Sequence, residues 1–69
     1  MNLDREWNFI IKKIGTIKNK STSFKKEIFN LQLLLILISK SKNKIEKKTL
    51  EIIYKNRKSL LCQYQIINQ

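Results

Sequence analysis

The sequence predicts an all-α protein in which an antiparallel two-helix hairpin follows an additional N-terminal helix, all within one small domain covering residues 1–69. Three observations favour this fold. The chain contains no proline, it shows no sustained strand-like alternation, and its apolar residues recur at intervals of three and four. Such spacing places apolar side chains along one face of a helix.

The first helix is expected over residues 1–17. Its apolar stripe consists of Leu3, Trp7, Ile10, Ile14 and Ile17. We expect Trp7 to belong to the core. Asp4 and Glu6 near the start of the helix suit its dipole. Gly15 weakens the last turn, because glycine costs about 1 kcal/mol relative to alanine inside a helix.

The second helix is expected over residues 24–39, with Thr22 or Ser23 as its N-cap. Its stripe consists of Phe24, Ile28, Leu31, Leu35 and Ile38. Residues 40–44 form a polar connection to a third helix over residues 45–67. The stripe of the third helix consists of Leu50, Ile53, Leu60, Tyr64 and Ile67. A connection this short favours an antiparallel hairpin.

Composition excludes several classes of protein and favours one kind of partner. The net charge of +10 indicates a polyanion, either nucleic acid or an anionic membrane surface. One cysteine, Cys62, and no histidine cannot build a zinc site or a Cys–His nucleophile within one chain. The carboxylates are scattered, and no glycine-rich phosphate loop is present. We therefore expect no enzyme, no cofactor and no small-molecule substrate.

The basic side chains of the third helix fall on the face opposite its expected stripe, and lysines of the connection extend this surface. Tyr54 borders the basic face, where a hydroxyl can bond a phosphate or a 2′-OH. Arg57 lies beside the stripe and is expected to extend outward. The candidate RNA-binding residues are Lys25, Lys26, Lys40, Lys42, Lys44, Lys47, Lys48, Tyr54, Lys55, Arg57 and Lys58.

The second helix is apolar on every side over residues 33–38. This run is too short to cross a membrane, which needs roughly twenty apolar residues. A hairpin buries only one side of the helix, and the first helix can cover only part of the rest. We therefore expect no membrane insertion and a neighbouring protein on the uncovered surface. The candidate protein contacts are Leu33, Leu34, Ile36 and Leu37, together with Phe9.

Two segments resemble motifs of one family. The segment KKEIFNLQ, residues 25–32, resembles the signature on the first long helix of the bacterial-type large-subunit ribosomal protein number 29 family. The matching positions are Glu27, Ile28, Phe29, Asn30 and Leu31. The segment IIYKNRKSLL, residues 52–61, is similar to the closing pattern of that family. The matching positions there are Ile53, Lys55, Arg57 and Leu60.

The resemblance implies a helical hairpin that binds large-subunit rRNA beside the polypeptide exit tunnel and contacts neighbouring ribosomal proteins. Three features depart from the family. Gln32 replaces an arginine, residues 34–44 replace a small, polar, glycine-containing linker, and residues 1–23 do not align. A divergent organellar copy would account for these departures. Ile, Lys and Asn, which have A/T-rich codons, are abundant, as is typical of a mitochondrion, a plastid or an A/T-rich bacterium.

Two other functions stay open at this stage. One is a small DNA-binding or regulatory protein that dimerises through its exposed leucines. The other is a peripheral membrane subunit that uses residues 33–38 as an interfacial patch and its lysines for anionic lipid. The third helix disfavours the membrane alternative, because its lysines lie opposite an apolar stripe with the spacing for packing against another helix.

Overall fold

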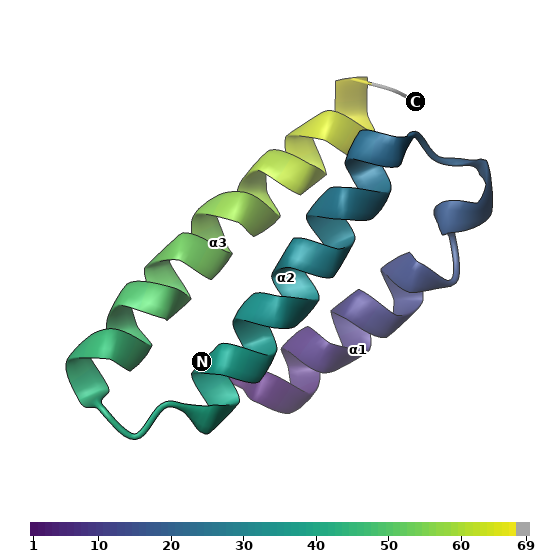
Figure 1. Ribbon diagram of the computed structural model, residues 1–69. Coiled ribbons are helices and arrows are strands. Elements are labelled where there is room, and N and C mark those ends of the chain that lie inside the picture. Colours follow the sequence, from purple (N-terminus) through teal and green to yellow (C-terminus); the bar gives the residue numbers. More distant parts are fainter. Residues whose placement is uncertain (68–69) are drawn as a thin grey trace.

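Three α-helices account for most of the chain in the computed structural model of the protein (Figure 1). They are α1 (Leu3–Ile14), α2 (Thr22–Lys40) and α3 (Lys44–Ile67), and a short 3-10 helix, η1 (Ile17–Asn19), follows α1. The structure describes the backbone of residues 1–67 and the side chains of these residues except Asn19 and residues 64–67. No strand occurs in the described backbone, so the all-α prediction is confirmed.

Polar side chains define where the helices begin. Asn2 accepts a hydrogen bond from the N–H of Arg5 (3.1 Å) at the start of α1. Ser21 accepts from the N–H of Phe24 (3.2 Å), so α2 begins two residues before the expected position. Asn43 Oδ1 accepts from the first turn of α3, including the N–H of Ile45 (2.9 Å). Each side chain satisfies a backbone donor that has no partner within its helix.

The first helix is shorter than the expected range of residues 1–17. It ends at Ile14, and Gly15 occupies its C-cap. The hydroxyl of Thr16 donates to the carbonyl of Lys13 (2.8 Å), a local bond that competes with continued helix. The chain then tightens into η1 and turns toward α2.

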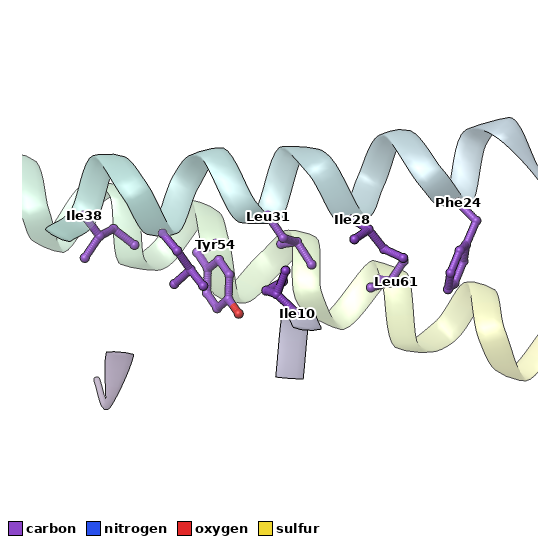
Figure 2. Packing of buried hydrophobic residues seen from close by; sticks show 8 residues of the cluster. Ile10, Phe24, Ile28, Leu31, Ile38, Tyr54 and Leu61 are labelled. Atoms are coloured by element: carbon purple, nitrogen blue, oxygen red, sulfur yellow. The ribbon is translucent and has the colours of Figure 1, made fainter. Parts of the chain in front are cut away.

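The three helices form an elongated bundle with extents of 38 × 19 × 18 Å. Residues 41–43 reverse the chain, so that α3 returns alongside α2, while α1 packs against α2 (Figure 1). The core lies between the three helices and contains Ile10, Phe24, Ile28, Leu31, Leu35, Ile38, Tyr54 and Leu61. Figure 2 shows the side chains of α2 pointing toward those of α3 and toward Ile10 of α1.

The stripes predicted for α1 and α2 are confirmed. All five stripe residues of α2 are buried. In the predicted first stripe, Ile10 is buried and the other residues, including Trp7 of α1 and Ile17 of η1, are partly buried against the core.

The stripe predicted for α3 is wrong in part. Leu50 packs against the core as expected, but Ile53 and Leu60 are 39% and 59% exposed. Tyr54 and Leu61, one position later in each case, are buried instead. The buried face is therefore shifted around α3 toward the side of Tyr54 and Leu61, by less than the 100° between successive helical residues because Leu50 belongs to both faces. Tyr64 and Ile67, the other predicted members, lie outside the described side chains.

The position of α1 explains this rotation. A hairpin alone would bury the side of α3 that faces α2. Because α1 also contacts the core through Ile10, the groove between the three helices becomes the most protected position. The large ring of Tyr54 occupies that groove with no exposed surface (Figure 2). Burying an aromatic side chain there removes more apolar area from water than burying Ile53 would.

Candidate nucleic-acid interface

Six of the predicted RNA-binding lysines form an exposed basic surface, which we call the α3 basic face. Its members are Lys40, Lys42, Lys44, Lys47, Lys48 and Lys55. All six are solvent-exposed, and no ion pair joins any of them to a carboxylate in the described part of the chain. Their charges are therefore available to an anionic ligand. Near the start of α2, Lys26 is exposed as well, whereas Lys25 is half-buried.

Tyr54 does not belong to the interface for which the sequence proposed it. Its side chain is fully buried, and its hydroxyl donates a 2.8 Å hydrogen bond to Glu6 Oε1. The residue therefore links α3 to α1 and cannot reach a phosphate or a ribose. The sequence pattern placed it at the edge of the basic face because the contribution of α1 to the core was not included.

Lys58, which was also predicted to bind RNA, is instead paired with a carboxylate of α1. Its Nζ lies 2.7 Å from Glu6 Oε1, and its side chain is 31% exposed. One carboxylate oxygen of Glu6 thus accepts hydrogen bonds from both Tyr54 and Lys58. This three-residue cluster holds the first turns of α1 against the middle of α3.

The cluster changes the proton affinity of its members. Burial of the Glu6 carboxyl tends to raise its pKa, but hydrogen bonds from Lys58 and Tyr54 and the charges of Lys58 and Arg5 favour the ionised form more strongly. The pKa of Glu6 therefore lies below its usual value. Burial, followed by the hydrogen bond to Glu6 and its negative charge, raises the pKa of Tyr54 well above the usual range. Near neutral pH the cluster holds an ionised carboxylate and a neutral phenol.

Arg57 extends outward, as the sequence predicted, but it has a partner. Its Nη1 lies 3.5 Å from Glu27 Oε1, with both side chains more than a third exposed. Such an exposed pair adds little to stability. It does bring a residue of the first family-like motif, Glu27, next to one of the second, Arg57.

The predicted protein-contact residues separate into two groups. Leu33 and Leu37 are 58% and 52% exposed, and Leu34 is half-buried. These three leucines line an open hollow with Ile53 of α3, which we call the apolar groove. Its remaining lining residues are Asn30 and Arg57. Because Arg57 and Lys58 lie on opposite sides of the buried face of α3, the apolar groove is on the side of the hairpin away from Glu6 of α1.

Ile36 and Phe9 do not join this groove. Both are half-buried, and Phe9 packs against the core. The ammonium groups of Lys58 and Lys13 lie 4.5 and 5.3 Å from the centre of the Phe9 ring. Phe9 is therefore a support for neighbouring cations rather than an open contact surface.

Sequence reasoning missed two contributors to these surfaces. Ile53 was expected in the core but lines the apolar groove. Arg5 was not among the predicted site residues, yet it lines a hollow together with Lys55 and Lys58. The shared three- and four-residue spacing of Arg5, Phe9 and Lys12 was the available signal, since it places them on one face of α1.

Within the described residues, no group of three His, Cys, Asp or Glu side chains is arranged to hold a metal ion. None of the described helices has the length and apolar character required to cross a membrane. No protein-family model, curated protein or solved structure matches the chain.

Proposed function

We propose that the protein is a structural constituent of the large ribosomal subunit. In this proposal the α3 basic face binds rRNA near the polypeptide exit tunnel, and the apolar groove contacts a neighbouring ribosomal protein. The protein has no catalytic role, and an organellar ribosome, mitochondrial or plastid, or that of an A/T-rich bacterium, is its place of action.

The observation that carries the proposal is the exposed state of six lysines that have no carboxylate partner among the described residues. Unpaired surface ammonium groups gain free energy by replacing the counterions condensed on a nucleic-acid backbone. Phosphate contacts of this kind fix position without reading sequence, which suits a scaffold protein.

The two family-like motifs support the ribosomal assignment over other RNA-bound proteins. They come from different helices, and Glu27 and Arg57 place them beside each other across α2 and α3. The finer arrangement implied by the resemblance, an antiparallel hairpin with a short additional N-terminal helix, agrees with the way α3 returns along α2 and α1 packs beside it (Figure 1).

The apolar groove supports a protein neighbour in addition to RNA. Leu33 and Leu37 keep about half of their surface in water although they belong to α2, the helix that packs against both α1 and α3. An assembly in which another protein covers them removes this apolar surface from solvent.

The test is co-sedimentation of the tagged, full-length protein with ribosomal subunits through a high-salt sucrose gradient. We expect the protein in the large-subunit fraction, because multiple phosphate contacts and an apolar contact together resist salt. Small-subunit fractions serve as the internal control. Recovery at the top of the gradient, as monomer or as a free dimer that binds DNA, would contradict the ribosomal assignment.

A further inference from the structure

Two hollows lie along α1, the first between α1 and α3 and the second between α1 and the segment before α2, and cations dominate both. The first, of about 200 Å³, is lined by Arg5, Lys55 and Lys58 around the Glu6 carboxylate. The second, of about 310 Å³, is lined by Phe9, Lys12, Lys13, Thr16 and Lys20. Arg5, Phe9 and Lys12 of α1 follow one another at intervals of four and three and therefore lie on one face of the helix.

The charged groups that line the second hollow are all positive. Three ammonium groups line it, and its lining contains no carboxylate. Aromatic rings help to position two of them, since Lys13 lies 5.3 Å from the centre of the Phe9 ring and Lys20 lies 5.6 Å from that of Phe24. A ring attracts an ammonium group but does not neutralise its charge.

The Phe9 ring connects the two hollows. Lys58, which is bonded to Glu6 in the first hollow, lies 4.5 Å from the centre of that ring, and Lys13 of the second hollow approaches the same ring. Since two ammonium groups already contact the ring, it is poorly suited to stacking on a base. The hollows therefore present positive charge to a ligand, which is the chemistry that recognises phosphate.

The spacing of the cations fits a run of phosphates. Arg5 and Lys12 are seven residues apart on α1, which corresponds to about 10 Å along the helix. A nucleic-acid strand carries one phosphate per nucleotide, so a backbone that follows α1 over this distance can meet more than one of these cations. A concave seam of this length suits a strand backbone better than it suits a flat lipid surface.

We propose that the phosphate backbone of an RNA strand lies along the α1–α3 junction and is bound by Arg5, Lys12, Lys13, Lys20 and Lys55, which we call the junction track. The proposal rests on the RNA binding proposed above and extends it. The sequence placed the RNA contact on α3, its connection to α2 and the start of α2, whereas the junction track adds α1 and the segment after η1. Lys55 is shared by the junction track and the α3 basic face.

The test measures the affinity of the full-length protein for an oligouridylate RNA as a function of salt concentration. Lys12→Gln and Lys20→Gln each remove one cation of the junction track and, because both residues are exposed, leave the core intact. We expect each to lower the slope of log affinity against log salt by about 0.7 to 0.9, the loss of one phosphate contact. Lys18→Gln is the matched control, since exposed Lys18 lies outside both hollows, and its slope should equal that of the wild type.

The outcomes separate this proposal from the proposed function. A wild type that binds no RNA contradicts both. RNA binding with an unchanged slope in Lys12→Gln and Lys20→Gln contradicts the junction track alone, as does an equal loss in Lys18→Gln. Phosphatidylserine vesicles serve as a second probe, and binding to them that exceeds binding to RNA and is lost in Lys12→Gln would assign the track to lipid instead. Circular dichroism checks that each variant keeps its helices.

Discussion

Lys58 of α3 donates a 2.7 Å hydrogen bond to Glu6 of α1, across 52 residues of sequence. The same oxygen of Glu6 accepts from the buried hydroxyl of Tyr54 at 2.8 Å. The Glu6 side chain is only 13% exposed, so its charge is largely removed from water and depends on these two donors. This contact joins the first turns of α1 to the side of α3 that carries the buried Tyr54.

Replacing Glu6 by Gln should weaken the attachment of α1. The amide keeps the shape of the side chain but removes the charge that pairs with Lys58. We expect the free energy of unfolding near neutral pH to fall by about 1–2 kcal/mol, which is the usual value for a partly buried, charge-assisted hydrogen bond. Urea denaturation followed by circular dichroism measures it. Asp4→Asn, at an exposed position of the same helical turn, should have little effect; an equal loss in both variants would contradict the special role of Glu6.

The contribution of Glu6 to the free energy of unfolding should depend on pH in the acid range. Because the pKa of Glu6 is lower in the folded state than in the unfolded chain, the contribution is fully present above about pH 4.3, the usual value for Glu. It is lost as the pH falls through the lowered pKa. The difference in free energy of unfolding between the wild type and Glu6→Gln should therefore narrow as the pH falls below about 4. A difference that stays constant from pH 7 to 2 would show that Glu6 ionisation does not stabilise the fold.

Tyr54 should stabilise the fold through both its ring and its hydroxyl. Tyr54→Phe keeps the ring, so we expect a loss of about 1 kcal/mol in the free energy of unfolding, whereas Tyr54→Ala leaves a cavity and should cost about 3–5 kcal/mol. The raised pKa of Tyr54 means that the folded state favours the neutral phenol. Its contribution is complete below about pH 10 and is lost as the pH rises through the raised value. Tyr54→Phe should consequently lose less stability than the wild type between pH 10 and 12, and an equal loss would argue against a buried phenol.

The helices themselves could be predicted from the sequence because their local signals agree. In α2 the five stripe residues share one face, and a single set of neighbours buries them. In α3 the apolar residues are spread over several sides, so two faces about 100° apart, marked by Ile53 and Tyr54, were both compatible with the pattern. The packing of α1 decides which of the two faces is buried. The position of α1 depends on contacts between residues far apart in the sequence, which the local spacing of apolar residues does not contain.

In the candidate site, too, features set by local sequence could be predicted, whereas features set by contacts between distant residues could not. The exposure of Lys44, Lys47 and Lys48 could be predicted, because burying an unpaired ammonium group is unfavourable and these side chains therefore stay in water. The roles of Tyr54 and Lys58 could not be predicted, because both depend on Glu6, 48 and 52 residues away. Tyr and Lys combine an apolar body with a polar tip, and such side chains suit a buried position next to a partner as well as a wet surface.

The α3 basic face should account for a measurable part of the RNA affinity. Lys47→Gln, Lys48→Gln and Lys55→Gln combined should lower the salt slope by about 2 to 3, since up to three phosphate contacts are lost. Lys58 is left unchanged, because its removal would break the pair with Glu6 and perturb the fold. Fluorescence anisotropy with a labelled rRNA fragment measures the slope. If the triple variant keeps the wild-type slope, the α3 basic face does not contact phosphate.

The apolar groove should govern assembly rather than stability. Leu33→Ser with Leu37→Ser replaces two leucines that are about half exposed in the isolated chain, so we expect the free energy of unfolding to change by less than about 1 kcal/mol. Recovery with large ribosomal subunits should fall several-fold, because the neighbouring protein loses its apolar contact. Ile45→Ser with Ile52→Ser is the matched control, since these residues are 79% and 61% exposed and lie outside the groove. Gradient sedimentation measures both pairs, and equal recovery of the leucine variant and the control would show that the groove is not an assembly surface.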